Sequence, residues 1–255
     1  MNSRYEVLLN GISLSSVHPN ILVLDVNYQP PETGFSTYNV AKRNGARIHK
    51  ENTSSISVSI SFEIHSYSVV ERQQICNMVS LWAKNGGMLE INDRPGQRMR
   101  CVCSQKPSIQ SARNWTDPVT VTFTAYTLPF WEESEYAVKA FSAGTSGDGF
   151  LYVPGSVDGA MIEADILANA TLSSVSLTAN GRTLTLSGLS VASGNTIKIS
   201  YTDDMIQQIK VGTTSLLSKR SGADDLIAKC GELNSVSFSS NASATVTFKA
   251  RGLWT

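Results

Sequence analysis

The chain has 255 residues, of which 41% are hydrophobic and 16% are charged, and its formal net charge is zero. The apolar fraction suffices for packed cores, and the low, balanced charge excludes a largely disordered chain. It also argues against a nucleic-acid-binding domain, which is normally strongly basic. At this length we expect two domains of ordinary size.

The first half of the chain predicts a β-sheet. One strand is expected at 21–28 and a clearer one at 56–64. In the second of these, isoleucine, valine and phenylalanine alternate with serine and glutamate. Such alternation indicates a strand with one buried and one solvated face.

A single helix is predicted after this strand, over about 69–85. Ser68 and Glu71 form a capping-box pattern at its start, and Gly86-Gly87 is typical of its end. Apolar residues then recur at helical spacing and predict the face that packs on the sheet. They are Ile75, Met78, Val79 and Trp82.

Strands are expected to resume at 88–91, 97–104 and 119–125, with a turn at 93–96. The alternation stops at 128–133, where the composition becomes acidic. We therefore place a domain boundary here, which gives domains 1–131 and 132–255.

The second half predicts only β-structure. A tight hairpin is expected around Asn180-Gly181, because both turn residues adopt positive φ readily and alternating apolar runs flank them. About eight strands spaced roughly ten residues apart fit a sandwich or jelly roll. The expected elements are 136–141, 150–153, 160–167, the hairpin around Asn180-Gly181, 196–201, 206–211, 235–239 and 245–249.

Motifs for catalysis or for a cofactor are absent from the sequence. The three histidines fall in no recognised metal or nucleophile motif, and no phosphate-binding loop occurs. Adjacent acids at 132–133, 203–204 and 224–225 point to opposite faces of a strand, so neighbours cannot share a proton. We therefore predict that the protein is not an enzyme and binds neither a cofactor nor a metal. The alternative is a calcium site at Asp203 and Asp204.

The four cysteines are predicted to be reduced, structural thiols, since their spacing matches neither a disulfide framework nor a zinc site. The chain shows no signal peptide and no apolar run long enough to cross a membrane. We therefore expect a protein that is made and kept in a cytoplasm, or that leaves it inside an assembly.

Two groups of residues are candidates for surface contacts. A basic segment around Asn44-Gly45 either touches a partner subunit or passing DNA, or forms a solvated hairpin tip; it contains Lys42, Arg43, Asn44, Arg47 and Lys50. Aromatic residues are candidates for surface anchors or sugar platforms. They are Trp115, Tyr152, Tyr201 and Trp254.

Several segments together resemble a known family. They are the 41–45 loop that leads into the Ser/Thr-rich 55–64 strand, the 88–95 strand and turn, 193–199, 229–236 and the closing 246–254 segment. This layout resembles the distal tail proteins (Dit) of siphovirus-type bacteriophages or prophages. The chain has Cys230-Gly231 where the family often has Pro-Gly, and it lacks the long receptor-binding arm of some relatives.

The resemblance implies a mainly β protein: a ring-forming domain over 1–131 with one helix, and a galectin-like β-sandwich over 132–255. It implies a hexameric ring at the virion tail tip, assembled in the bacterial cytoplasm. The implied partners are the tail tube protein, the tail-tip hub protein of the tail-associated lysin type, and the tape-measure protein. A receptor-binding protein or a host glycan would dock outside, and DNA would only pass through. The alternative is a carbohydrate-binding module that contacts the host surface.

Overall fold

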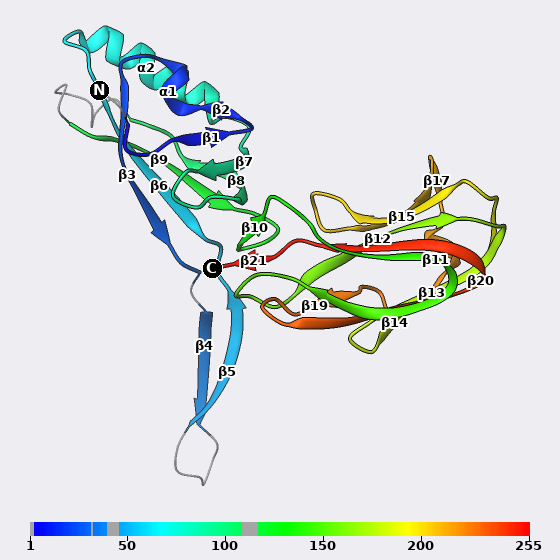
Figure 1. Ribbon diagram of the computed structural model, residues 1–255. Coiled ribbons are helices and arrows are strands. Elements are labelled where there is room, and N and C mark those ends of the chain that lie inside the picture. Colours follow the sequence, from blue (N-terminus) through cyan, green and yellow to red (C-terminus); the bar gives the residue numbers. More distant parts are fainter. Residues whose placement is uncertain (1–2, 32, 40–45, 109–116) are drawn as a thin grey trace. The chain divides into compact units, whose positions relative to one another are not determined.

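The computed structural model describes residues 3–31, 33–39, 46–108 and 117–255. The chain forms two compact units, Met1–Trp131 with Thr255, and Glu132–Trp254. Both units consist mainly of β-strands (Figure 1), which confirms the expected fold class.

The first unit is built on an antiparallel sheet whose main path runs β2-β1-β7-β8-β9-β6-β3. The expected strands at 21–28, 56–64, 88–91, 97–104 and 119–125 are all present within one or two residues. Their bounds are β1 Val7–Leu9, β2 Ile12–Ser13, β3 Ile21–Gln29, β6 Ser57–Ile64, β7 Gly87–Ile91, β8 Gln97–Gln105 and β9 Val119–Ala125.

Two helices lie together on one side of this sheet (Figure 1), the four-residue α1 (Leu14–Val17) and α2 (Val69–Trp82). Apolar side chains of the strands face the helices: Trp82 meets Phe123 edge to face, with ring centres 5.8 Å apart. The Trp82 Nε1 also donates to the Ile12 carbonyl at 3.0 Å, so the end of α2 is fixed to β2.

Helix α2 begins as the sequence predicts, with the Ser68 hydroxyl accepting a hydrogen bond from the Glu71 backbone N–H. The return bond of the capping box is not made. The Glu71 carboxylate instead accepts from the Ser66 hydroxyl and from Asn20 Nδ2, and the Ser66 hydroxyl accepts from the Ser68 N–H. Ser66 therefore takes the role expected of Glu71.

The helix is shorter than predicted, since it ends at Trp82 rather than near residue 85. Ala83 is fully buried, and the chain then turns back through Gly86, which has φ +62°. A Cβ at Gly86 would lie 2.2 Å from the Cys101 carbonyl, so the close approach of β8 requires glycine there. Met78 was expected in the core with Ile75 and Val79 but lies on the exposed face of α2.

An arm with a sheet of its own follows β3. Its strands β4 (Thr33–Asn39) and β5 (Ala46–Thr53) pair antiparallel, and Asn39 lies opposite Ala46. The Asn44-Gly45 turn of the sequence analysis lies outside the described residues.

The second unit contains a ten-stranded sheet with the main path β17-β16-β15-β12-β20-β13-β14-β18. Strand β11 pairs with β20, and β19 pairs with β12. The bounds are β11 Ala137–Tyr152, β12 Ala160–Ala168, β13 Leu172–Ala179, β14 Arg182–Val191, β15 Thr196–Tyr201, β16 Gln207–Val211, β17 Thr214–Ser215, β18 Arg220–Gly222, β19 Ile227–Ala228 and β20 Leu233–Ala250. The predicted hairpin is confirmed: β13 and β14 are joined by Asn180 and Gly181, with φ of 50° and 78°.

The strands expected at 136–141 and 150–153 are one strand, β11, and those expected at 235–239 and 245–249 are one strand, β20. The two pair at both ends, 137–141 with 246–250 and 146–152 with 233–239, and between these segments Gly144 pairs with Ala244 across two register shifts. The prediction of separate strands was wrong because the linking Ser-, Gly- and Ala-rich residues show no alternation. Backbone pairing nevertheless continues through them.

On the side away from β11, the long strand β20 pairs with two different strands. Its first part pairs with β13 and its second part with β12. Between these parts the Asn241 Oδ1 accepts hydrogen bonds from the Ser173 and Ser174 N–H groups, at 2.8 and 2.9 Å. The side chain of Asn241 thus holds the point at which β20 passes from one neighbour to the other.

Candidate assembly surfaces

The face of the first sheet that points away from the helices carries a ladder of paired hydroxyls on β6 and β9. Ser57 faces Thr124, Ser59 faces Thr122 and Ser61 faces Thr120, with Oγ···Oγ1 distances of 3.2, 3.0 and 3.4 Å. We call these three pairs the hydroxyl ladder. Side chains alternate along a strand, so the ladder follows directly from the Ser and Thr positions in the two sequences.

The ladder is neutral, because serine and threonine carry no charge, and its hydroxyls bond to one another. Ser104 extends it toward β8, where its hydroxyl accepts from Thr124 at 2.9 Å. On β8 the same face carries Arg98 and Arg100, with Arg98 opposite Glu90 of β7. The uncharged stripe is therefore confined to the three pairs on β6 and β9. Charged residues adjoin it on both sides, with Arg98 and Arg100 on β8, Glu63 next along β6, and Asp25 of β3 opposite Ser61.

The outer face of α2 carries no charge over most of its length, although Gln73, Gln74 and Asn77 are exposed on it beside apolar residues. Between the buried Arg72 and Lys84, its exposed residues carry no charge. Leu81 is 71% exposed, and Val70 is 66% exposed eleven positions earlier, on the same side of the helix. A surface helix normally presents charged residues to solvent, so a face without charge and with exposed valine and leucine is a candidate for contact with another protein.

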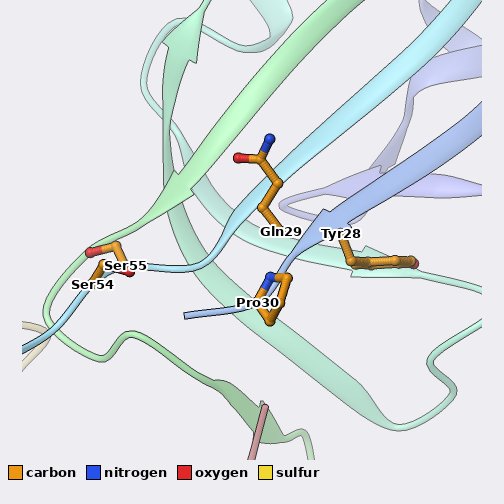
Figure 2. A pocket seen from close by; sticks show the side chains of 5 residues that line it. All are labelled: Tyr28, Gln29, Pro30, Ser54 and Ser55. Atoms are coloured by element: carbon orange, nitrogen blue, oxygen red, sulfur yellow. The ribbon is translucent and has the colours of Figure 1, made fainter. Parts of the chain in front are cut away.

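An open depression of about 450 Å³ lies where the arm joins the sheet. Figure 2 shows Tyr28, Gln29 and Pro30 at the end of β3 on one side, and Ser54 and Ser55 at the entry to β6 on the other. None of these five side chains is charged, and the Tyr28 hydroxyl is engaged with Asp93. The lining offers shape and hydrogen bonds but no group for acid–base chemistry.

A smaller hollow of about 270 Å³ is lined by residues 19–22 and His65. The Nε2 of His65 lies 3.3 Å from the carboxylate of Glu63, two residues earlier in the chain. No second base or nucleophile is among the lining residues.

In the second unit, three large apolar side chains are exposed together at one end of the β11–β20 pair. Tyr152 lies opposite Leu233 in the ladder, and Phe150 lies two residues before Tyr152 on the same face. Their exposed fractions are 62% for Phe150, 55% for Tyr152 and 66% for Leu233. We call these residues the β11 apolar group.

A polar cluster occupies another part of the same unit. The Tyr136 hydroxyl contacts both oxygens of Glu163 at 3.1 and 3.2 Å, and the Arg251 guanidinium lies 3.8 Å from the Tyr136 ring centre. Lys249 is paired with Asp165. Burial raises the pKa of Glu163, and Tyr136 and Lys249 oppose this rise. The carboxylates of Glu163 and Asp165 both have partners, so we interpret the cluster as a structural network.

Two further absences hold within the part of the chain that the structure describes. It contains no group of three or more His, Cys, Asp and Glu residues that could hold a metal ion. It also contains no helix with the length and apolar character needed to cross a membrane. All four cysteines are free thiols: Cys76, Cys101 and Cys230 are buried, and Cys103 is half-buried.

Of the predicted basic contact segment, Lys42, Arg43 and Asn44 lie outside the described residues. Arg47 and Lys50 lie on β5, opposite Tyr38 and Phe35 in the arm.

The candidate aromatic residues differ in their surroundings. Trp115 lies outside the described residues. Tyr201 is half-buried and accepts from Gln207 Nε2, and burial raises its pKa. The Trp254 Nε1 donates to the Glu133 carboxylate at 2.7 Å. Only Tyr152 of the described candidates is largely exposed.

Comparison with solved structures gives a match over nearly the whole chain. SPP1 Dit (gp 19.1), described as a paradigm of the hub adsorption apparatus in phages that infect Gram-positive bacteria, aligns over 97% of this chain and 98% of its own, with a TM-score of 0.73 and 10% identity. The chain has the fold of a phage Dit protein. The resemblance expected from the sequence is thereby confirmed at the level of the fold.

A second similar structure is a chain of the phage P2 baseplate in its activated conformation with Ca. It aligns over 97% of both chains, with a TM-score of 0.51 and 9% identity. No protein-family model matches the chain, and no curated protein matches it. The likeness to a Dit fold therefore lies in the arrangement of elements rather than in conserved residues.

Two of these surfaces are not predictable from the sequence as surfaces, although Tyr152 of the second was a candidate. Leu81 and Val70 were passed over because the helix was interpreted only through its buried stripe. Phe150 and Leu233 were passed over because 150–153 was treated as an isolated strand. The signal for the second group was the alternation from Asp148 to Tyr152, but its meaning depends on the pairing of Tyr152 with Leu233, which is not local.

Proposed function

We propose that this chain is the distal tail protein of a siphovirus-type phage or prophage. In this role it is a structural hub with no catalytic function. Six copies would form a ring at the tail tip, joined to the tube protein on one side and to the tail-tip hub protein on the other. The observation that carries the proposal is the fold match to SPP1 Dit along both units of the chain.

A ring closes only if one edge of each copy meets a different edge of the next copy at a fixed angle. The sheet of the first unit ends in β2 on one side and in the nine-residue β3 on the other. We assign these two edges to neighbouring copies, so that the sheets together form the wall of the ring. The domain boundary proposed from sequence, after Trp131, leaves this wall to residues 1–131.

With this wall, one face of the sheet lies toward the channel and the other toward the outside. We assign the hydroxyl ladder to the channel, because passing DNA and the tape-measure protein require a surface that does not hold them; on the same face, the neighbouring Arg98 lies opposite the acidic Glu90. Basic side chains would bind phosphates through release of counterions, whereas paired hydroxyls offer no such attraction. The uncharged outer face of α2 then lies outside, as a surface for other tail components.

Imaging of particles tests the ring. The purified chain, alone and mixed with its tube protein, is examined by negative-stain microscopy and native mass spectrometry. We expect closed six-fold rings in at least the mixture. Open filaments, or a chain that stays monomeric with the tube protein present, would contradict the proposal. The surface variant Ser235→Lys, placed in the second unit, is the matched control and should form the same rings.

A second candidate function is supported by one observation. Phe150 and Tyr152 expose two aromatic rings beside serine hydroxyls, and aromatic faces beside polar groups are typical of sugar sites. A glycan array with the full chain and with Tyr152→Ala tests it. Saturable binding by the native chain that Tyr152→Ala loses would support a host-glycan contact by the second unit. If the native chain binds no glycan on the array, those sugars are excluded as ligands.

A further inference from the structure

Asparagine followed by glycine is a dipeptide that can lose its side-chain amide spontaneously. The backbone nitrogen of the glycine attacks the amide carbon of the asparagine side chain, and the glycine has no Cβ to hinder the approach. Because the two groups adjoin in one chain, the reaction is unimolecular, and its rate depends on how freely they can meet. The chain has four such pairs, and the structure describes all except the one at 44–45; the others are at 10–11, 85–86 and 180–181.

The side-chain amide of Asn180 is fixed by three hydrogen bonds. Its Nδ2 donates to the Ile227 carbonyl at 3.1 Å and to the Oδ1 of Asn234 at 2.7 Å. Its Oδ1 accepts from the Ser235 N–H at 3.2 Å. The amide carbon cannot turn toward the nitrogen of Gly181 unless these bonds break.

The side-chain amide of Asn10 is also fixed. Its Nδ2 donates to the Gly86 carbonyl at 3.0 Å, and its Oδ1 accepts from the Met88 N–H at 3.0 Å. The Asn10 backbone N–H donates to the Met88 carbonyl at 2.8 Å. Asn10 therefore ties the turn between β1 and β2 to the segment that leads from α2 into β7.

Asn85 lies in that segment and differs from both. Its side chain is exposed, and it makes no hydrogen bond or ion pair with any residue in the part of the chain that the structure describes. The attacking group is the Gly86 nitrogen, whose N–H donates to the Ala83 carbonyl at 3.1 Å. This bond closes the turn after α2, and the ends of helices open at little cost in free energy.

We propose that Asn85 is a modification site, which converts spontaneously to aspartate and isoaspartate in the folded protein while Asn10 and Asn180 are protected. The Gly86 nitrogen bonds to the Cγ of Asn85, and the side-chain nitrogen leaves as ammonia with the proton that Gly86 gives up. Water then opens the cyclic imide at one of its two carbonyls. Opening at one gives aspartate, and opening at the other gives isoaspartate. Water is the only other reactant.

Isoaspartate at position 85 changes the segment between α2 and β7. The main chain then runs through the former side chain, which adds one methylene before Gly86. A Cβ at Gly86 would lie 2.2 Å from the Cys101 carbonyl, so the longer chain cannot be taken up on that side without moving β8. A shift of the Gly86 carbonyl weakens its bond from Asn10. We therefore expect Asn10 to become reactive after Asn85, in the same molecules.

Peptide mapping of the ageing protein tests the site. The purified full chain is incubated at pH 8, and mass spectrometry with chromatographic separation measures asparagine, aspartate and isoaspartate at each position over time. We expect Asn85 to be lost at least tenfold faster than Asn180, and Asn10 to follow after a lag. The rates should fall at pH 6, because the glycine nitrogen attacks in its deprotonated form.

Two controls separate the effect of the fold from that of the local sequence. In concentrated urea the three asparagines should react at similar rates, because the hydrogen bonds of Asn10 and Asn180 are lost. The variant Asn85→Gln should fold, since the position is exposed, and it should react far more slowly because glutamine must close a larger ring. In this variant Asn10 should stay intact.

Loss of Asn85 no faster than that of Asn180 in the folded chain would overturn the proposal. The same would follow if Asn85 kept its lead in urea, since the cause would then be the local sequence. Modification of Asn10 at the native rate in Asn85→Gln would overturn the coupling between the two sites. None of these measurements depends on ring formation, so the proposed function can fail while this inference holds, and the reverse.

Discussion

The side-chain amide of Asn180, in the tight turn between β13 and β14, donates a hydrogen bond of 2.7 Å to the Oδ1 of Asn234. Asn234 is 1% exposed, and its amide also donates to the Leu151, Lys229 and Glu232 carbonyls. Its Oδ1 accepts from the Lys229 N–H as well. One buried side chain thus joins the predicted hairpin to the start of β20 and the end of β11.

Asn234→Ala should lower the free energy of unfolding by about 2–4 kcal/mol, because it leaves several buried polar groups without partners. Urea unfolding followed by circular dichroism measures this. Ser235→Ala, at the next and exposed position, should change stability by less than about 0.5 kcal/mol. Equal stability of Asn234→Ala and the native chain would show that water replaces these bonds.

Arg94 stacks between two aromatic rings of the first unit. Its guanidinium carbon lies 4.8 Å from the Tyr28 ring centre and 5.0 Å from that of the buried Trp131. Its Nη1 also donates to the Thr255 carbonyl at 3.2 Å. We expect Arg94→Lys to cost about 1 kcal/mol, because a lysine keeps the charge but loses the planar stack. Arg182→Lys, on exposed β14, is the control and should be neutral in the same urea titration.

We expect the free energy of unfolding to decrease in alkaline solution, because the thiol of Cys101 is buried. Burial raises the pKa of this thiol from 9.0 to about 12, although a hydrogen bond with the Gly87 backbone opposes the rise. Above pH 9 the unfolded chain releases the proton while the folded chain keeps it. The unfolded state therefore binds fewer protons, and the free energy of unfolding decreases by up to about 1.4 kcal/mol per pH unit until the folded thiol ionises.

Urea titrations at pH 8, 9 and 10 measure this slope in the native chain and in Cys101→Ala. Burial also raises the pKa of Tyr28 and Cys76, so some slope remains in the variant. We expect it to be clearly shallower. Parallel pH dependences in the two chains would remove Cys101 as a cause.

A charge on the outer face of α2 should impair assembly of the tail without lowering the stability of the fold. Leu81 contributes little to the core, so Leu81→Glu should leave the free energy of unfolding within about 0.5 kcal/mol. If other tail components cover this face, complementation of a phage lacking the native gene should drop by at least tenfold. Leu81→Met, which keeps an apolar side chain at the same position, is the matched control and should complement fully. Full complementation by Leu81→Glu would mean that this face stays open to solvent in the particle.

Positive charge on the hydroxyl ladder should slow the passage of DNA. The double variant Ser59→Arg, Thr122→Arg places two cations on a face that now carries paired hydroxyls. Particles carrying it should assemble but release their genome more slowly, and added salt should reduce the delay because it screens phosphate binding. Ser59→Ala tests loss of the hydroxyl pair without added charge. Normal release kinetics in the double variant would place the ladder away from the channel.

The regular parts of the first unit were predictable because their signal is local. The alternation from Ile56 to Ile64 identified β6 and both of its faces, and the alternation from Val119 to Ala125 did the same for β9. The hydroxyl ladder needs only these two patterns and their pairing. Asn180-Gly181 predicted the hairpin equally well, because the two turn residues themselves must adopt positive φ.

Predictions failed where a distant partner decides the outcome. The middle of β11 is rich in glycine, serine and alanine, and it is a strand only because β20 runs beside it. Met78 fits the helical stripe of Ile75 and Val79, yet the sheet reaches only part of that stripe. The capping role of Ser66 likewise depends on the chain path between β6 and α2.

The sequence by itself therefore determined the mainly β character, the positions of the strands with alternating side chains, the start of the helix and the layout that resembles a tail protein. Only the tertiary structure decided which surfaces stand open: the uncharged outer face of α2 and the β11 apolar group. The physical reason is that alternation and turn chemistry act between neighbours in the chain. Exposure, by contrast, depends on which distant strand lies alongside, and for Tyr152 that strand is the one carrying Leu233.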